Sequence, residues 1–283
     1  MRRSTRSHVS AAGEVGTPAY GVASEPLVTR ELRALGSALG EAHRRVTDAQ
    51  VKEAALEQSR RDLVAGMSHD LRTPLAGMRA MAESLEDRVI TDEETVARYH
   101  RQLRVEVDRM SMMVSDLFEL ARVQGSLRLE LERVGAGDLV AEAMASADPV
   151  ARAKGVHLAV SHAGALPVDV DPTELGRALQ NLLVNAIRHT PSDGTILVAT
   201  EPAESFVAVS VTDSCGGIPE ADLDRVFETA FRGGAARTRH PQQGGGLGLA
   251  IARGIVEAHH GDISVRNLDG GCRFELRLPL AVD

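Results

Sequence analysis

The chain has 283 residues, a length that suits two compact domains. Hydrophobic residues make up 43% and charged residues 25% of the composition, as in ordinary globular proteins, but aromatic residues make up only 2%, so any core must be built from Leu, Val, Ala and Met. The net charge of −8 argues against non-specific binding to nucleic acid or anionic lipid, so a macromolecular partner is expected to be a protein.

Targeting and redox features are sparse. The two cysteines, Cys215 and Cys272, are too few for a disulfide framework, and no other residues stand near them at metal-ligand spacing, which suits a reducing cytoplasm. No run approaches the roughly 18 to 20 apolar residues of a membrane-spanning helix. We therefore expect no membrane span in this chain and a cytoplasmic location, with membrane association if a sensor segment belongs to a longer polypeptide. Residues 1–27, with scattered Gly, Ser and Pro, are predicted to form a disordered arm.

A long helix is predicted from Val28 to about Arg88, because breakers are rare and apolar residues recur every seven positions. A second helix is predicted to start at Thr91, with Glu94 completing a capping box. Its apolar period includes Val107, Val114 and Ala121. One hairpin cannot bury both of its faces, so we expect a homodimer that completes a four-helix bundle. A monomeric hairpin packed on the second domain is the alternative.

The octapeptide SHDLRTPL, residues 68–75, is the most informative segment of the first helix. The heptad register places His69 at the position farthest from the seam, so its imidazole is expected to face water. Asp70 can accept a hydrogen bond from one ring nitrogen and make the other nitrogen a better nucleophile. Pro74 removes a helical hydrogen bond at a cost of about 3 kcal/mol, which suggests a bendable site. By itself, an exposed His beside an Asp is usually solvated surface.

After Gly125 the pattern changes to short alternating runs and shorter helices, which indicates a second domain with α/β layers. The predicted strands are Leu127–Val134, Val156–Ser161, Thr195–Thr200, Phe206–Asp213, Asp262–Asn267 and Cys272–Leu278. The predicted helices are Ala136–Ala151, Asp171–His189, Pro219–Phe227 and Leu247–Ala258.

Three weak signals in this second domain suit a nucleotide. Asn181 and Asn185 are four residues apart on a predicted helix, and amide oxygens are suitable ligands for Mg²⁺. Asp213 ends a predicted strand, where a carboxylate can accept a hydrogen bond from a purine amino group. The glycine-rich run 244–248 opens a helix, whose free N–H groups favour phosphate. Each signal also has a structural explanation that involves no ligand: the asparagines can be surface amides, the segment after Asp213 an ordinary turn, and the glycine-rich run a flexible loop.

The order and spacing of these segments resemble the N, first glycine, F and second glycine boxes of two-component sensor histidine kinases, and the octapeptide resembles their H box. The resemblance implies an α+β protein, in which a helical-hairpin dimerisation domain precedes an α/β sandwich of the Bergerat ATP-binding type. The implied domains are a linker helix resembling a partial HAMP segment (28–58), a dimerisation and histidine phosphotransfer domain (59–125) and a catalytic ATP-binding domain (126–283).

The resemblance also implies roles for individual residues. His69 would be the phosphoacceptor, Asp70 would assist the transfer, and Thr73 would help to place water when the partner is dephosphorylated. At the nucleotide site, Asn185 would hold Mg²⁺ and Asp213 would read adenine. The nucleotide would be lined by Asn181, Arg188 and His189, and the pocket and lid would be shaped by Gly217, Gly244, Gly246 and Gly248. The lid would also carry Arg232, Arg237 and Arg239, which would reach the γ-phosphate or form a solvated basic loop.

The implied function is autophosphorylation of His69 from MgATP, followed by transfer to an aspartate of a response regulator receiver domain and, in addition, dephosphorylation of that partner. One departure is Cys215, which stands where the family usually has the first Gly of Asp-x-Gly-x-Gly. If that position needs φ > 0, a Cys there costs roughly 1 to 2 kcal/mol, although Gly216 can absorb the turn. The alternatives are a catalytically degenerate dimeric scaffold of the same fold and a related ATPase or serine kinase.

Overall fold

The computed structural model describes residues 30–125, 127–162, 166–229, 231 and 246–281, together with the side chains of most but not all of these residues. The predicted arm and most of the predicted lid, 232–245, lie outside the described residues. The chain divides into two compact units, residues 1–61 and 62–283. The first described element is helix α3, Arg30–Glu86, which matches the long helix expected from the heptad pattern. No helix among the described residues is long and apolar enough to cross a membrane.

Helix α4, Glu93–Gln124, is the second helix of the hairpin. Its N-cap is Asp92, whose Oδ1 accepts the backbone N–H of Thr95 at 2.8 Å, so the predicted capping box starting at Thr91 is wrong by one residue. A carboxylate caps a helix as well as a hydroxyl does, and its charge also suits the positive end of the helix dipole.

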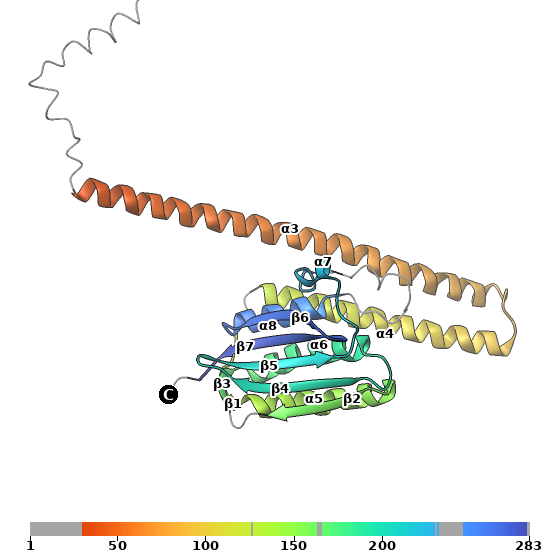
Figure 1. Cartoon of the computed structure of the whole chain (residues 1–283). Helices are drawn as coiled ribbons and strands as arrows, with labels where there is room; N and C mark the ends of the chain where they lie inside the picture. The colour runs from red at the N-terminus through yellow and green to blue at the C-terminus, as the bar shows by residue number, and fades with distance from the viewer. Residues whose placement is uncertain (1–29, 126, 163–165, 230, 232–245, 282–283) are drawn as a thin grey trace, which may run out of the picture. The chain divides into compact units, whose positions relative to one another are not determined.

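The α/β domain follows and contains two sheets (Figure 1). A five-stranded sheet has the order β2-β4-β5-β7-β6, in which only the β2–β4 pair is parallel, and a two-stranded antiparallel sheet pairs β1 with β3. The strands are β1 Glu132–Gly135, β2 His157–His162, β3 Pro167–Val170, β4 Thr195–Pro202, β5 Phe206–Asp213, β6 Asp262–Leu268 and β7 Gly271–Pro279. The helices are α5 Ala136–Lys154, α6 Pro172–His189, α7 Glu220–Leu223 and α8 Gly248–Ala258.

Most of the predicted elements are present, with three corrections. Strand β3 was not predicted, because a run of only four residues that begins with Pro carries little strand signal. Strand β1 begins at Glu132 rather than Leu127, since only its last residues pair with β3. The helix predicted over Pro219–Phe227 is reduced to the single turn of α7, because the residues after Leu223 form turns instead.

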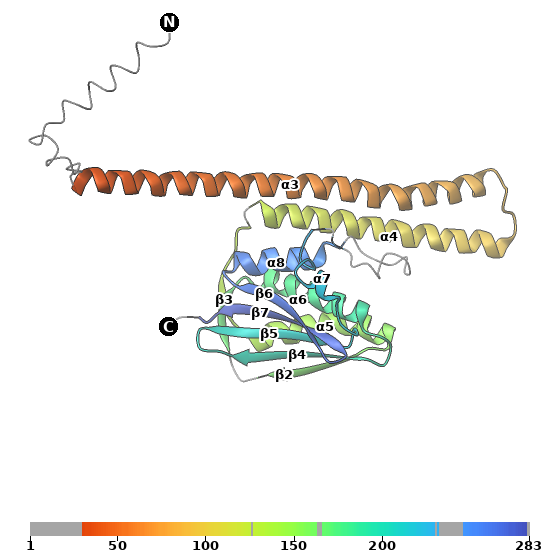
Figure 2. The ribbon, with the colours of Figure 1, turned by 45° about the horizontal axis from the view of Figure 1, so that its top comes forward.

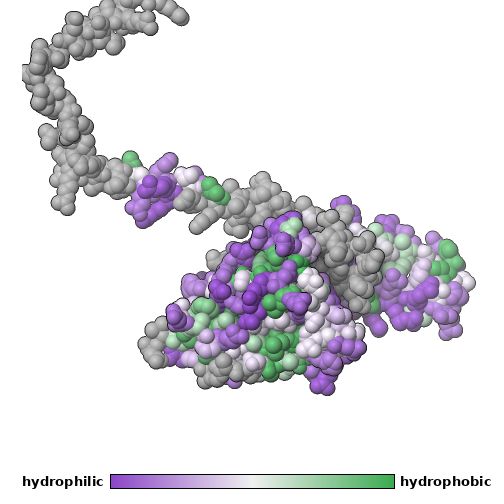
Figure 3. Space-filling model, in the orientation of Figure 1, coloured by the Kyte–Doolittle hydropathy of each residue, from purple (hydrophilic) through white to green (hydrophobic). Residues whose placement is uncertain are grey.

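Helices α5, α6 and α8 lie on one side of the five-stranded sheet, which makes a two-layer sandwich (Figure 2). Helix α6 supplies much of the core, and its buried residues Leu175, Leu179, Leu182 and Leu183 follow the helical period. Across the core, Phe274 is almost fully buried and packs edge-to-face on Phe227, with ring centroids 6.1 Å apart. The visible face of this domain in Figure 3 mixes hydrophobic and hydrophilic residues.

The end of α4 packs against this sandwich, within the same compact unit. Leu120 is buried in the core, and Arg122 forms a bidentate ion pair with the largely buried Glu174 of α6, with Nη1–Oε1 at 2.9 Å and Nη2–Oε2 at 2.5 Å. Glu119 joins the same network through Arg122 Nη2, at 3.3 Å, and also pairs with Arg177 of α6, at 2.9 Å. The last turns of α4 are thereby fixed to the start of the helix that carries Asn181 and Asn185.

A buried polar junction fixes the same end of α6. Asp171 is the N-cap: its Oδ1 accepts the N–H of Glu174 at 3.1 Å, and its Oδ2 accepts the N–H of Glu130 at 3.0 Å. The backbone N–H of Asp171 donates to Nε2 of the buried His259, whose Nδ1 bonds the carbonyl of Ile255. Burial alone would raise the pKa of Asp171, but the backbone N–H donors outweigh it and the pKa lies below its ordinary value.

We expect Asp171→Asn to flatten the acid limb of the stability curve. Because the folded state lowers this pKa, the stabilisation is present above the unfolded-state value of about 3.9 and is lost as the pH falls through the folded value. The wild-type free energy of unfolding should therefore fall more steeply than that of the variant below about pH 4. Urea unfolding across pH measures this, with Asp224→Asn at an exposed position as control; equal acid limbs for wild type and Asp171→Asn would contradict the assignment.

Candidate functional site

The phosphoacceptor segment, residues 68–75, is helical throughout in α3, and Pro74 is buried within it. Ser68 and Thr73 are exposed and Asp70 is half-buried, and each of the three has an interaction partner. The side chain of His69 lies outside the described set, so its exposure stays a prediction from the heptad register. The backbone places His69, Asp70 and Thr73 on little more than one turn of a single helix.

Helix α6 brings four of the predicted nucleotide-site residues together. Asn181 and Asn185 are half-buried in its middle, and Arg188 and His189 form its last turn. The end of the helix is held by Lys154, whose Nζ donates to the carbonyl of Ile187 at 2.7 Å and also to that of Arg188. An ammonium group bound to these carbonyls stabilises the negative end of the helix dipole.

The electrostatics of this helix end bear on His189. Although His189 as a residue is exposed, desolvation of its imidazole lowers its pKa, and the neighbouring positive charge of Arg188 lowers it further. The carboxylate of Asp213 acts in the opposite direction but does not prevail. The imidazole is therefore neutral at pH 7 and can accept as well as donate a hydrogen bond.

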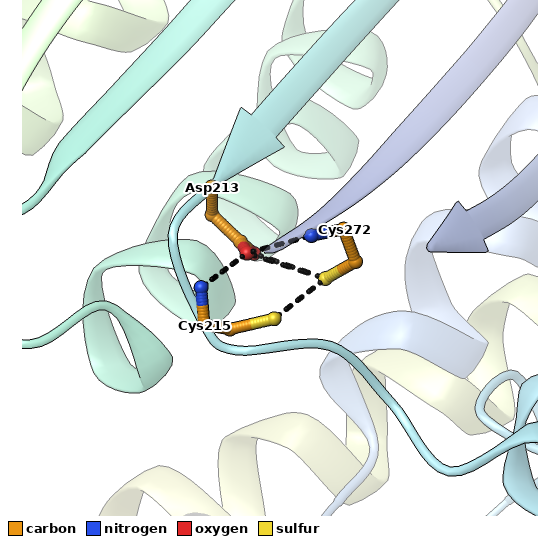
Figure 4. A group of neighbouring side chains, drawn as sticks. All are labelled: Asp213, Cys215 and Cys272. Atoms are coloured by element: carbon orange, nitrogen blue, oxygen red, sulfur yellow. Dashed lines mark hydrogen bonds between the residues drawn. The ribbon is translucent and has the colours of Figure 1, made fainter. Parts of the chain in front are cut away.

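Asp213 is the last residue of β5, the central strand of the five-stranded sheet, and it is buried, with 5% of the residue exposed. Its Oδ1 accepts the backbone N–H of Cys215 at 3.0 Å and that of Cys272 at 3.4 Å (Figure 4). The thiol of Cys272 lies 3.2 Å from Oδ1 and 3.4 Å from Oδ2. These donors hold the carboxylate in one orientation, as a site that reads a base requires.

The backbone of the loop after Asp213 shows which residue has positive φ where the family pattern has its first glycine. Gly216 and Gly217 have φ of 84° and 94°, whereas Cys215 is not among the described non-glycine residues with positive φ. The left-handed turn is thus made one residue later than the first glycine of the family pattern, and Cys215 bears no backbone strain. The cost of roughly 1 to 2 kcal/mol that a Cys with positive φ would carry therefore does not arise, because Gly216 absorbs the turn.

Two residues that the sequence analysis did not single out shape this loop. Asn267 accepts the N–H of Ile218 at 2.8 Å and donates to the carbonyl of Ile218 at 2.7 Å, which closes the loop onto β6. Gly271 opens β7 so close to Asp213 that a Cβ built on it would lie 1.8 Å from the Asp213 carbonyl oxygen. Asp269-Gly270-Gly271 reads only as a turn in the sequence, and the approach to Asp213 depends on the pairing of β5 with β7.

The helix predicted to receive phosphate starts next to the asparagine helix. A Cβ built on Gly248 would lie 3.3 Å from Oδ1 of Asn181, so the first turn of α8 and the middle of α6 adjoin. The N-cap residue, Leu247, provides no side-chain cap for the first turn of α8. Gly246 has φ of 70°, a conformation that glycine adopts without strain. Gly244 and Arg232, with Arg237 and Arg239, lie outside the described residues.

A two-layer sandwich in which a buried carboxylate, an asparagine helix and a glycine-opened helix adjoin is the architecture of a Bergerat-type ATP-binding domain, here preceded by a helical hairpin. Comparison with known families agrees. The His Kinase A (phospho-acceptor) domain model matches residues 59–126, and the model of histidine kinase-, DNA gyrase B- and HSP90-like ATPases matches residues 170–282. The chain belongs to the sensor histidine kinases.

Individual relatives support the same assignment. The sensor-like histidine kinase SenX3 of Mycobacterium tuberculosis is 36% identical over 232 residues, which cover 81% of this chain and 56% of SenX3. The chain thus spans little more than half the length of this relative. Among solved structures, the histidine kinase ThkA in complex with the response regulator TrrA matches with a TM-score of 0.66 at 24% identity, covering 78% of this chain and 61% of that one. ShkA in complex with AMPPNP matches with a TM-score of 0.57 at 26% identity, covering 77% and 46%.

Proposed function

We propose that this chain uses ATP to phosphorylate His69 and passes the phosphoryl group to an aspartate of a response regulator receiver domain, which it also dephosphorylates. The observation that carries the proposal is that α6 adjoins both the first turn of α8, at Asn181, and the buried Asp213 carboxylate, at His189, on a chain that also contains the SHDLRTPL helix. The similarity to SenX3 and the solved complex of ThkA with a response regulator support it.

In this proposal the base is read at Asp213. A carboxylate that already accepts backbone N–H donors has lone pairs left for an exocyclic amino group, and it rejects a carbonyl at the same position. Gly216 and Gly217 let the backbone pass close to the base. Adenine, with an amino group where guanine has a carbonyl, is therefore the purine that this edge of the sheet selects.

The phosphate end is assigned to α6 and α8. The first-turn N–H groups of α8 are suited to bind phosphate oxygens, and they adjoin α6 at Asn181, one helical turn before Asn185; both asparagines are half-buried. An amide oxygen is a ligand that suits Mg²⁺, so Asn185 fits the metal position, and the bound ion would offset charge on the phosphate oxygens. Arg188 adds positive charge at the same helix end, and Arg232 and Gly244 complete the proposed lid.

The dimer is proposed from apolar exposure on the hairpin. Val107 and Val114, which the heptad pattern places in the seam, are 51% and 39% exposed in the single chain, and Phe118 is 73% exposed. A second copy would cover such a stripe and complete a four-helix bundle. Asp70 and Thr73 would then flank the phosphoacceptor on the outside of the bundle, where a receiver domain can dock.

Phosphotransfer profiling tests the proposed function. The purified chain, labelled with [γ-³²P]ATP and mixed with receiver domains in turn, should lose its label within minutes to one cognate receiver and much more slowly to the others. A receiver whose acceptor aspartate is replaced by asparagine is the control and should take no label. Stable labelling of the chain with no transfer to any receiver would contradict the phosphotransfer role, and absence of labelling would contradict the kinase role.

A further inference from the structure

The two cysteines of the chain, 57 positions apart in the sequence, meet at the adenine end of the proposed nucleotide site (Figure 4). Both are free, and their sulfur atoms are 3.0 Å apart. Cys215 is half-buried in the loop after β5, whereas Cys272 at the start of β7 is only 1% exposed. The sequence spacing gave no reason to pair them; the antiparallel pairing of β5 with β7 brings them together.

We propose that Cys215 and Cys272 form a reversible disulfide under oxidation by a hydroperoxide, and that this modification weakens nucleotide binding at Asp213. A disulfide needs a sulfur–sulfur distance of about 2.0 Å, so the two atoms must approach by only about 1 Å. Cys215 precedes Gly216 and Gly217, whose backbone freedom allows that movement. The nucleotide part of the inference rests on the proposed function; the cross-link itself does not.

The different exposure of the two thiols sets the order of events. The sulfur of Cys215, after losing its proton, attacks one peroxide oxygen; the O–O bond breaks, the attacked oxygen stays on sulfur as a sulfenic acid, and the other oxygen takes up a proton and leaves as water or, from an organic hydroperoxide, as an alcohol. The sulfur of Cys272 then attacks that of Cys215, the S–O bond breaks and a second water leaves. The Cys272 proton has an acceptor in Asp213, which lies 3.2 Å from its sulfur. Two thiols are oxidised, and one hydroperoxide is reduced.

The surroundings of the pair predict a slow reaction at neutral pH. Burial raises the pKa of Cys215, and the hydrogen bond to Asp213 raises it further; burial, with the neighbouring Cys215 and Asp213, also raises that of Cys272. Because the thiolate is the attacking species, the rate should rise about tenfold per pH unit between pH 7 and 9. A pair that reacts only with sustained oxidant suits a site that must stay reduced during normal turnover.

Closure of the bond acts directly on the group that reads the base. Cys215 donates its N–H to Oδ1 of Asp213, and its sulfur accepts the N–H of Gly217 at 3.4 Å. Movement of Cys215 toward β7 disturbs both contacts, and oxidation removes the thiol hydrogen that Cys272 directs at the carboxylate. We expect the affinity for ATP to fall about tenfold. By linkage, bound nucleotide should slow cross-linking.

The test uses the full chain, reduced, treated with EDTA, and then exposed to hydrogen peroxide. Intact mass should fall by two hydrogens, peptide mapping should recover a cross-linked Cys215–Cys272 peptide, and dithiothreitol should reverse both changes. Calorimetry with a non-hydrolysable ATP analogue should show a roughly tenfold weaker affinity after oxidation. In Cys215→Ala, and independently in Cys272→Ser, the affinity before and after peroxide should be the same.

Two results of the peroxide treatment would overturn the proposal: formation of sulfinic or sulfonic acids only, or a cross-link that leaves the affinity for the ATP analogue unchanged. A reduced chain that retains equimolar zinc and is thereby blocked from cross-linking would also overturn it, because Asp213, Cys215 and Cys272 would then form a metal site. A reduced chain that fails to bind the ATP analogue would instead contradict the proposed function, while the mass measurement would still report on the cysteine pair.

Discussion

His69→Gln should abolish the labelling of this chain by [γ-³²P]ATP, with a loss of at least a thousandfold in the rate. Glutamine is a good helix former and keeps the polarity of the position, so α3 should stay folded. What the variant lacks is the ring nitrogen that we propose attacks the γ-phosphorus, because a glutamine amide is not a nucleophile. Binding of an ATP analogue should be unchanged, because the proposed nucleotide site lies elsewhere in the chain.

His100→Gln on α4 is the matched control, since it removes an exposed histidine from the other helix of the hairpin. This variant should label at the wild-type rate. Label that persists in His69→Gln, or that is lost equally in His100→Gln, would show that the phosphoacceptor has been assigned to the wrong residue. Circular dichroism of both variants distinguishes loss of the nucleophile from loss of the helix.

Gly271→Ala should lower nucleotide affinity at least tenfold and reduce the free energy of unfolding by about 3 kcal/mol, the upper end of the usual cost of overpacking. The added methyl group would lie 1.8 Å from the carbonyl oxygen of Asp213 and 2.9 Å from its carbonyl carbon. Both are backbone atoms, so no side-chain rotation relieves the overlap. Either β5 or β7 must shift, and the Asp213 carboxylate, which we propose reads the base, shifts with the backbone.

Gly176→Ala provides the contrast. Gly176 lies in α6, and a Cβ built on it meets nothing within 4 Å among the described residues. Alanine there should be neutral or stabilising by up to about 1 kcal/mol, because glycine is the poorer helix former. Thermal unfolding and calorimetry on the two variants check the pair. Equal effects, or a Gly271→Ala variant that binds ATP normally, would contradict the close approach at Asp213.

Much of the fold could be predicted because its strongest elements carry their own signals. The strand Phe206–Asp213 and the helix ending at His189 have the predicted bounds to within a residue, since alternation and a buried apolar stripe define them locally. Strand β3 exists only because β1 pairs with it, as in the register Glu132 with Val170. That pairing is a tertiary contact, and it cannot be predicted from the four residues of the strand alone.

The candidate site divides in the same way. Asn181, Asn185 and Asp213 could be found from the sequence because each lies in a motif with fixed order and spacing. Asn267, Gly271 and Cys272 could not, because they reach Asp213 and its loop only through the pairing of β5, β6 and β7. For Cys215 the sequence left two conformations open, and residue identity alone did not decide between them: the left-handed backbone falls on Gly216 and Gly217 rather than on Cys215.

The central claim is tested most directly by locating the phosphate. The full chain is incubated with ATP and Mg²⁺, kept at neutral to alkaline pH, digested, and sequenced by tandem mass spectrometry over residues 62–80. We predict a single phosphoryl group on His69, lost on brief treatment with acid. Acid-stable phosphate on Ser68 or Thr73 in the same segment, or an unmodified segment from a chain that binds ATP, would contradict the account.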